Sequence, residues 1–142
     1  GYTYGPPMAV APINQVRRVV EYAVTEIPPE KINLGIPNYA YDWPLPFERG
    51  VTAARTINNV QAVRIAIEQG ASIAFDMLAK SPYFNYIQDS VEHEVWFEDV
   101  RSLTAKFDLI NEFNLRGCSY WQIMQFFRAN WLLLKNQFYI SK

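Results

Sequence analysis

Two short apolar runs, each next to an amphipathic helix, limit the fold of this chain more than any other feature. The first run spans residues 32–36, and the second, "CSYWQI", spans residues 118–123. Strands that alternate with helices along a chain usually form a parallel sheet that helices cover. Two strands are too few to complete such a sheet, so we expect this α/β chain to form part of a larger fold.

The helices around these runs have recognisable starts. Apolar residues recur every three or four positions over residues 13–27, directly after Pro12, which suits the first turn of a helix. A second stripe covers residues 100–113, and Asp99 before it is a candidate N-cap. The stretch "NWLLLKNQF", residues 130–138, predicts a last amphipathic helix.

A smaller α+β unit is expected between the first strand and the second long helix. Residues 44–59 are polar and predict a loop, and Asn59 is a candidate cap for a helix over residues 60–69. The turn-like sequence at residues 88–93 predicts an antiparallel hairpin. The strand-like runs of this unit are residues 72–76, 83–87 and 94–97.

Composition and charge exclude several classes of function. The formal net charge is −1 and no basic run is present, so nucleic acid and anionic membrane surfaces are not expected partners. No apolar run approaches the roughly 18 residues of a membrane span. Cys118 is the single cysteine, which excludes a disulfide within the chain and a cysteine-rich metal site. We expect no metal and no cofactor.

Three stretches of the chain follow one another in a characteristic order. "KINLGIPNYAYDW" holds Gly35, Pro37 and Tyr39 in a Gly-x-Pro-x-Tyr pattern, and "EVWFEDVRSLTAKFDLINEFNLRG" and "GCSYWQI" come after it. Together they resemble glycoside hydrolase family 18, the chitinase-like (β/α)8 barrels. The resemblance is strongest to the branch of spore-cortex-lytic and spore-germination hydrolases, and it covers nearly the whole chain.

The resemblance implies a position within that barrel. It identifies the chain as the C-terminal part of a (β/α)8 TIM barrel, with the last two strands and their helices. Residues 1–43 and 96–142 would belong to the barrel, and residues 44–95 would form the inserted α+β subdomain.

The resemblance also implies a reaction mechanism, and it shows which catalytic residues of the family are absent from this chain. The catalytic signature of the family, Asp-x-x-Asp-x-Asp-x-Glu, does not occur in these 142 residues. In the family its glutamate is the general acid, and the N-acetyl group of the substrate attacks the anomeric carbon, which gives retention without an enzyme nucleophile. We therefore expect no catalytic residue in the chain and no turnover by the chain alone.

Trp121 is the first candidate for binding a ligand. From the residues alone, a core tryptophan and a ligand platform are both open. Ligands of parallel-barrel enzymes bind at the C-terminal ends of the strands, where Trp121 is expected. The resemblance implies that this tryptophan stacks under a sugar ring.

A second group of candidates follows the first strand. Tyr39, Tyr41, Asp42 and Trp43 combine aromatic rings with a carboxylate, which suits the apolar faces and hydroxyl rims of sugars. A packed tyrosine cluster without a ligand is the alternative. The chitinase branch more often has Gly-Arg after the first tyrosine, so Ala40 and Tyr41 argue against chitin itself as the substrate.

The remaining polar candidates have simpler interpretations. Asp76 is expected at the surface of the insertion, with a contact at the rim of the substrate cleft as the alternative. Glu98 and Asp99 form a carboxylate pair, but a cap for the following helix explains them without catalysis. His93 lacks companions with metal-ligand spacing and is expected in solvent.

The leading hypothesis is a portion of a family 18-like glycosidase that acts on N-acetylglucosamine-containing glycan, either spore-cortex peptidoglycan or a chitin-like polymer. The resemblance places it in the bacterial cell envelope, in the spore or outside the cell. A non-catalytic glycan-binding module and a structural half-barrel are the alternatives. An unpaired sheet edge with an apolar inner face also predicts self-association.

Overall fold

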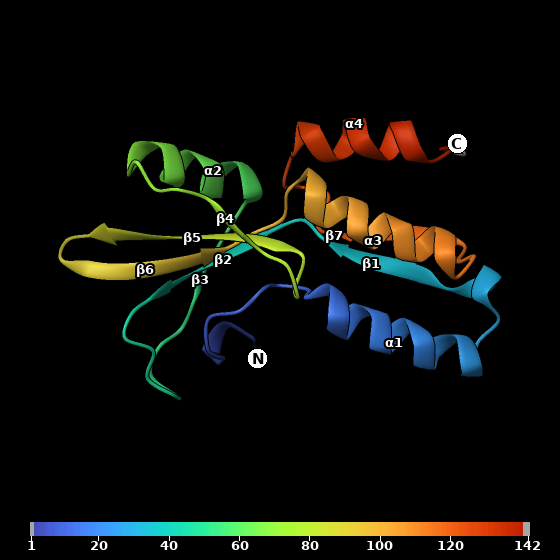
Figure 1. The fold of residues 1–142 in the computed structure, drawn as a ribbon, viewed down its shortest axis with the longest axis horizontal. Coiled ribbons are helices and arrows are strands. Elements are labelled where there is room, and N and C mark those ends of the chain that lie inside the picture. Colours follow the sequence, from blue (N-terminus) through green and yellow to red (C-terminus); the bar gives the residue numbers. More distant parts are fainter. Residues whose placement is uncertain (1, 141–142) are drawn as a thin grey trace.

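The computed structural model describes residues 2–140, which form two sheets and four α-helices (Figure 1). Short 3-10 turns occur at Tyr2–Tyr4 and Pro29–Lys31. The other elements, in chain order, are α1 (Ile13–Glu26), β1 (Asn33–Pro37), β2 (Ala40–Pro44), β3 (Arg55–Ile57), α2 (Asn59–Glu68), β4 (Ala74–Asp76), β5 (Ser81–Gln88), β6 (Val91–Trp96), α3 (Val100–Glu112), β7 (Gly117–Trp121) and α4 (Arg128–Gln137).

The two strands predicted for the parallel sheet, β1 and β7, pair with each other in parallel. Side chains of a strand alternate between its faces, and here one face carries Leu34 and Ile36, which are buried under α1 and α3. Cys118 and Tyr120 of β7 pack into the same cluster, which α4 also joins. Burial raises the pKa of the Cys118 thiol, in keeping with a small apolar side chain in a structural position.

The opposite face of the β1–β7 sheet is open. Asn33 and Gly35 of β1 and Ser119 and Trp121 of β7 are all exposed. The helices that pack on this sheet therefore cover one face, and the face that carries Trp121 is accessible.

The second sheet has five strands in the order β3-β2-β6-β5-β4, all antiparallel to their neighbours. It lies to the left of the β1–β7 sheet in Figure 1, beyond the C-terminal ends of those strands. The predicted hairpin is confirmed: β5 and β6 meet at Gln88 and Val91, and Asp89 and Ser90 between them have φ of 51° and 64°. Positive φ at both central residues is the geometry of a two-residue hairpin turn.

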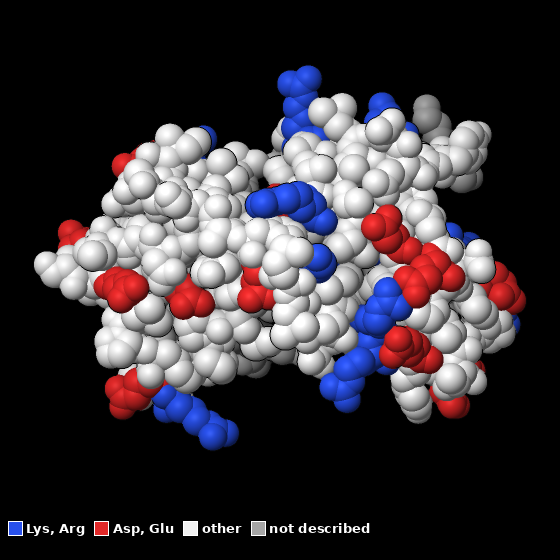
Figure 2. Space-filling model, viewed as in Figure 1, with Lys and Arg blue, Asp and Glu red and all other residues white. Residues whose placement is uncertain are grey.

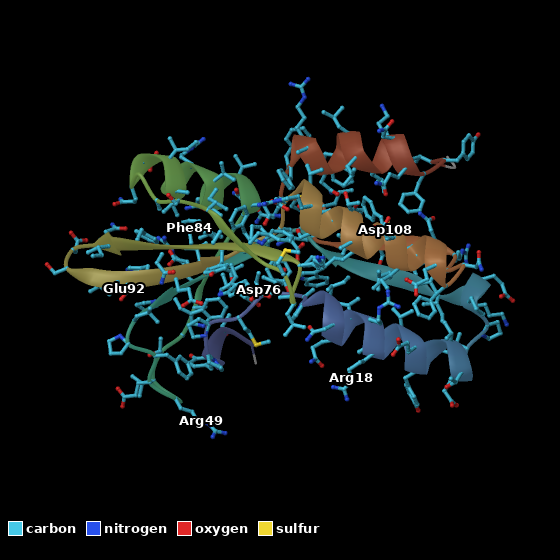
Figure 3. All side chains as sticks on the ribbon, in the orientation of Figure 1. Arg18, Arg49, Asp76, Phe84, Glu92 and Asp108 are labelled. Carbon is cyan, nitrogen blue, oxygen red and sulfur yellow. The ribbon has the colours of Figure 1, made fainter. Side chains whose placement is uncertain are left out.

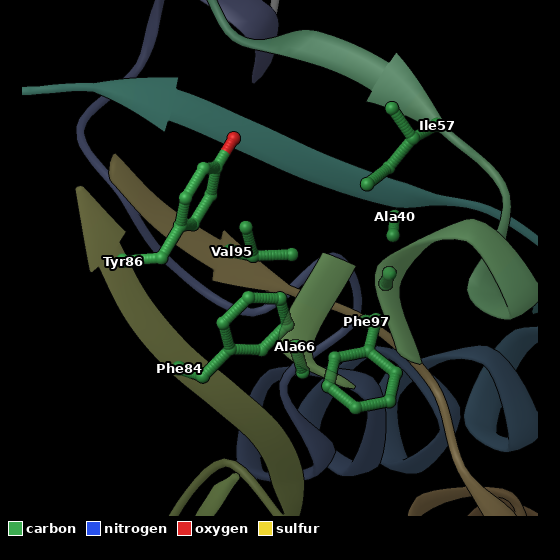
Figure 4. Close-up of a cluster of buried hydrophobic side chains, with 8 residues drawn as sticks. Ala40, Ile57, Ala66, Phe84, Tyr86, Val95 and Phe97 are labelled. Carbon is green, nitrogen blue, oxygen red and sulfur yellow. The ribbon is translucent and has the colours of Figure 1, made fainter. Parts of the chain in front are cut away.

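One face of this sheet packs against α2. Ala62 and Ala66 of the helix form a buried cluster with Phe84 of β5, Val95 of β6 and Phe97, the residue after β6 (Figure 4). The small alanines let the helix approach the aromatic rings closely, and these contacts give the subdomain a core of its own.

Three sequence expectations need correction here. Residues 40–44, expected at the end of the first strand, form the separate strand β2, and part of the expected loop 44–59 forms β3. Both strands are short, and they are stabilised by pairing with each other and by pairing of β2 with β6. The helix cap is Asn58, not Asn59: Asn58 is extended, and its side chain accepts a 2.7 Å hydrogen bond from the Gln61 amide.

The expected cap of the second long helix is confirmed. The Asp99 carboxylate accepts hydrogen bonds from the Arg101 and Ser102 amides, and the Ser102 hydroxyl oxygen accepts a 2.9 Å bond from the Asp99 amide. This reciprocal arrangement is a capping box, and it satisfies amides that have no partner within the helix. The role of Asp99 is thereby structural.

Charges of both signs are interspersed over the face shown in Figure 2, without a field of one sign. The best-paired surface charges join α1 to α3, where Arg17 makes two hydrogen bonds of 2.6 and 2.7 Å to Glu112. Within residues 2–140, no helix is long and apolar enough to cross a membrane.

Candidate functional site

Trp121 stands at the C-terminal end of β7 with 74% of its surface exposed. Its partner in the parallel register is Pro37, the last residue of β1. A core tryptophan would be enclosed by other side chains, as Trp43 is at 1% exposure in a cluster with Ala9, Ala54 and Trp96. The exposed indole therefore lies at the strand ends, where the sequence placed a ligand platform.

Asn38 was not among the predicted site residues. It makes hydrogen bonds to Trp121 and to the segment that follows it. Its backbone amide donates a 2.8 Å hydrogen bond to the Trp121 carbonyl oxygen. Its side-chain amide donates to the carbonyl oxygens of Gln122, at 3.0 Å, and of Gln125. Asn38 is 1% exposed, so these bonds are shielded from water. Its position between Pro37 and Tyr39 of the Gly-x-Pro-x-Tyr pattern was the one sequence signal that pointed to this residue.

The aromatic residues after β1 form a continuous chain of ring contacts. The rings of Tyr39 and Tyr41 meet edge to face at 5.4 Å, and those of Tyr41 and Trp43 do so at 5.3 Å. Across the sheet, Trp96 pairs with both Tyr41 and Tyr83 and stacks on Tyr83 at 4.6 Å. Tyr39 and Tyr41 are partly exposed, whereas Trp43 is buried and donates a 2.9 Å hydrogen bond to the Gly5 carbonyl oxygen.

Asp42 lies on the other face of β2 and is enclosed by donors. Its carboxylate accepts hydrogen bonds of 2.7 Å from Arg55 and 2.9 Å from the Tyr86 hydroxyl, and it lies 2.9 Å from His93 Nδ1. The side chain is 1% exposed. Burial, and next the hydrogen bond to Asp42, raise the pKa of Tyr86 to about 12.

This network corrects the expectation for His93. The imidazole is not free in solvent: its side chain is 20% exposed, and its ring stacks on Tyr86 with 4.7 Å between ring centres. No local pattern indicates this contact, because Asp42 is 51 residues away from His93. Within residues 2–140, no group of His, Cys, Asp or Glu side chains has the arrangement of a metal site.

Asp76 is half-buried where the second sheet meets the start of α1 (Figure 3). Its Oδ1 accepts hydrogen bonds of 2.9 Å from the Leu78 amide and 2.6 Å from the Ala79 amide, which fixes the turn after β4. It also lines a cavity of about 270 Å³ together with Pro12, Gln15 and Trp96. Contact with a ligand at this rim stays a prediction.

Glu98 and Lys106 form an ion pair that is closed to solvent. Lys106 Nζ lies 2.9 Å from Glu98 Oε2, and both side chains are 1% exposed. Burial raises the pKa of the Glu98 carboxyl, while the Lys106 ammonium opposes that rise. The Glu98 amide donates a 2.9 Å bond to Asn59 Oδ1, so the pair ties α3 to the first residue of α2.

Comparison with known proteins shows the family of this chain. The profile described as glycosyl hydrolases family 18 matches residues 4–125. The chain belongs to this family.

Two relatives of this family 18 chain are cortical fragment-lytic enzymes. That of Bacillus subtilis (strain 168) is 52% identical over 143 residues, covering 100% of this chain and 33% of that protein. That of Bacillus cereus is 45% identical over the same span. The chain thus spans about a third of the length of these curated relatives.

Solved structures agree with the family. The spore cortex-lytic enzyme SleL of Bacillus megaterium QM B1551 matches with a TM-score of 0.95 and 48% identity over 98% of this chain and 33% of that one. A chitinase from Chromobacterium violaceum ATCC 12472 matches with a TM-score of 0.84 and 30% identity over 92% of this chain and 40% of that one. The resemblance to spore-cortex-lytic members of family 18 is confirmed, and the fold is a mixed α/β part of a TIM-barrel-family protein.

Proposed function

We propose that the gene product containing this chain hydrolyses N-acetylglucosamine-containing glycan, with spore-cortex peptidoglycan as its substrate rather than chitin. In this proposal the chain supplies the sugar platform and one wall of the substrate cleft. The observation that carries it is the exposed indole of Trp121 at the C-terminal end of β7. The names of the relatives, cortical fragment-lytic enzyme and spore cortex-lytic enzyme, support the choice of glycan.

The chemistry of a sugar ring suits this platform. One face of a pyranose is lined by C–H groups and packs on an aromatic ring, while its hydroxyl rim needs hydrogen-bonding partners. Tyr39 and Tyr41 are partly exposed beyond the end of β1 and bring phenol groups to the same end of the β1–β7 sheet. Trp43 and Asp42 are each 1% exposed, so we assign them to holding β2 in place rather than to direct sugar contact.

In the proposed architecture, β1 and β7 are the last two strands of a (β/α)8 barrel. The support is that they pair in parallel and that their helices cover one face and leave the other open. The five-stranded sheet and α2, from Ala40 to Trp96, would then be the inserted subdomain that stands at the C-terminal ends of the strands. This changes the expected bounds of the insertion from residues 44–95 to residues 40–96.

The proton donor of the reaction is assigned outside residues 1–142. General acid catalysis requires a donor within hydrogen-bond reach of the glycosidic oxygen. Glu98 is enclosed with Lys106, and Asp99 is engaged by the Arg101 and Ser102 amides, so neither carboxylate is placed to reach a substrate. A substrate N-acetyl group acting as nucleophile, as the family resemblance implies, would need no further carboxylate from this chain.

Release of reducing ends from cortex fragments and from chitooligosaccharides tests the proposal. We expect turnover by the gene product, higher on cortex fragments, and none by residues 1–142 alone. Turnover by the 142-residue chain that Glu98→Gln or Asp99→Asn abolishes would overturn the assignment of the proton donor. Glycan binding by the gene product without any turnover would instead identify a glycan-binding module.

The open face of the β1–β7 sheet also leads us to propose that residues 1–142 associate when produced alone. Each of these strands has one unpaired edge, and such edges pair readily with another chain. Trp121, Ile123, Met124 and Phe126 add an exposed apolar stretch at 69–81% exposure. Light scattering tests this, and a monomer that keeps the structure described here would contradict it.

The location of the gene product in the spore or cell envelope is part of the same proposal, and detection in isolated spores would support it.

A further inference from the structure

A groove of about 770 Å³ runs between α2 and the segment that leads from β7 into α4. One wall is a face of α2 with Val60, Arg64 and Ile65, and the other wall carries Met124, Phe126 and Arg128. The two walls come from parts of the sequence about 60 residues apart, so no local pattern indicates the groove. Within the part of the chain that the structure describes, its apolar lining is accessible: Met124 is 81% and Phe126 is 70% exposed.

The groove carries positive charge on both walls. Arg64 and Arg128 are exposed, and neither forms an ion pair with any residue between 2 and 140. Glu68 lies one helical turn beyond Arg64, which leaves a net positive charge in the lining. An arginine side chain presents a planar fork of N–H donors that fits a carboxylate.

The groove lies close to the sugar platform. Met124 is three residues after Trp121, so at most roughly 11 Å of extended chain separates them. Asn38 fixes this connection, because its side chain binds the carbonyl oxygens of Gln122 and Gln125. A peptide substituent of a few residues on a ligand bound at the Trp121 indole could therefore reach the groove.

We propose that this groove binds the acidic stem peptide of peptidoglycan, with Arg64 and Arg128 pairing with its free carboxylates. The inference rests on the proposed function and names the feature that would separate peptidoglycan from chitin. Alternate sugars of peptidoglycan carry a short peptide on a lactyl ether, whereas chitin is neutral and has no such branch. An extended peptide spans about 3.3 Å per residue, so a stem of a few residues bridges the distance from platform to groove.

The expected gain in affinity is small because the Arg64 and Arg128 side chains are exposed to solvent. Each exposed charge pair contributes little on its own, and two together are expected to change affinity by roughly 3- to 10-fold. The preference should weaken as salt is added, because salt screens exposed charges.

The test measures binding to the complete gene product by calorimetry, with three S-linked tetrasaccharides that resist hydrolysis. One carries stem peptides with free carboxylates, one carries the same peptides amidated, and one has no peptide. We expect the acidic ligand to bind roughly 3- to 10-fold more tightly than the amidated one at low salt.

Arg64→Gln with Arg128→Gln should remove this difference, and Arg64→Lys with Arg128→Lys should keep most of it. Arg18→Gln, on an exposed arginine that points away from α1 into solvent, is the control and should change nothing (Figure 3).

The outcomes separate this inference from the proposed function. If all three ligands bind equally and the Arg64→Gln, Arg128→Gln variant matches the wild type, the stem-peptide site is wrong while glycan binding stands. If none of the three binds, the proposed function itself fails. Loss of the preference in the Arg18→Gln control would show a general charge effect and would also overturn the site.

Discussion

The backbone amide of Asn38 donates a 2.8 Å hydrogen bond to the carbonyl oxygen of Trp121, across 83 residues of sequence. The bond joins the chain just after β1 to the last residue of β7 and so continues the register of the two strands. The Asn38 side-chain amide then donates to the carbonyl oxygens of Gln122 and Gln125. Trp121 is thus fixed through its main chain, while its indole is exposed.

Replacing Asn38 with alanine should loosen this end of the sheet. The change removes both side-chain donors and leaves two carbonyl oxygens without these partners, which we expect to lower the free energy of unfolding by roughly 1–3 kcal/mol. Glycan affinity should fall as well, because Trp121 loses its fixed support. Urea unfolding and glycan binding of the gene product measure the two effects.

Asn111→Ala is a matched control for that experiment. Asn111 is exposed in the last turn of α3, next to the start of β7 and away from the C-terminal strand ends, so its loss should leave glycan binding unchanged. Equal binding by the Asn38→Ala and wild-type proteins would contradict the role given to Asn38.

Trp121 and Trp43 should respond in opposite ways to truncation. Trp43 is 1% exposed in a cluster with Ala9, Ala54 and Trp96, so Trp43→Ala should cost about 3–5 kcal/mol of stability, as large core truncations do. Trp121 is 74% exposed, so Trp121→Ala should cost less than about 1 kcal/mol. It should instead abolish glycan binding or turnover. Chemical denaturation and activity of both variants decide this, and a strongly destabilised Trp121→Ala protein with normal activity would identify a core residue.

The features that the sequence predicted correctly depend on neighbours along the chain. The stripe over residues 13–27 and the Asp99 cap are local patterns, and so is the turn at Asp89 and Ser90. Each is set by residues within one or two turns of each other, so a single sequence contains the information.

The features that it missed depend on distant partners. Strand β3 lies in a polar stretch and exists because it pairs with β2, and the partners of Asn38 are 84 and 87 residues away. His93 was expected in solvent because nothing near it in sequence indicates the buried Asp42. Trp121 was predicted at the end of a strand, where the structure places it, but Asn38, which binds the main chain there, was not predicted, since hydrogen bonds between remote segments leave no periodic trace.

Tyr86 should be among the last tyrosines to ionise. Burial and the bond to Asp42 raise its pKa to about 12, above the ordinary value of about 10. The protonated, hydrogen-bonded form therefore stabilises the fold fully below about pH 10, and this contribution is lost as the pH rises through about 12. Alkaline titration of phenolate absorbance should show a late component that Tyr86→Phe reduces. Burial also raises the pKa of Tyr120, so Tyr120 should account for the part that remains.

The buried pair of Glu98 and Lys106 should be far more sensitive to losing one partner than to losing both. Lys106→Met leaves the Glu98 carboxylate without its 2.9 Å partner in a site closed to water, which we expect to cost about 3–5 kcal/mol. Lys106→Met combined with Glu98→Gln removes both charges and should recover a large part of that loss, because no ion remains to be desolvated. Urea unfolding of the two single variants and the double variant forms a complete cycle. Additive losses would show that the two side chains do not interact.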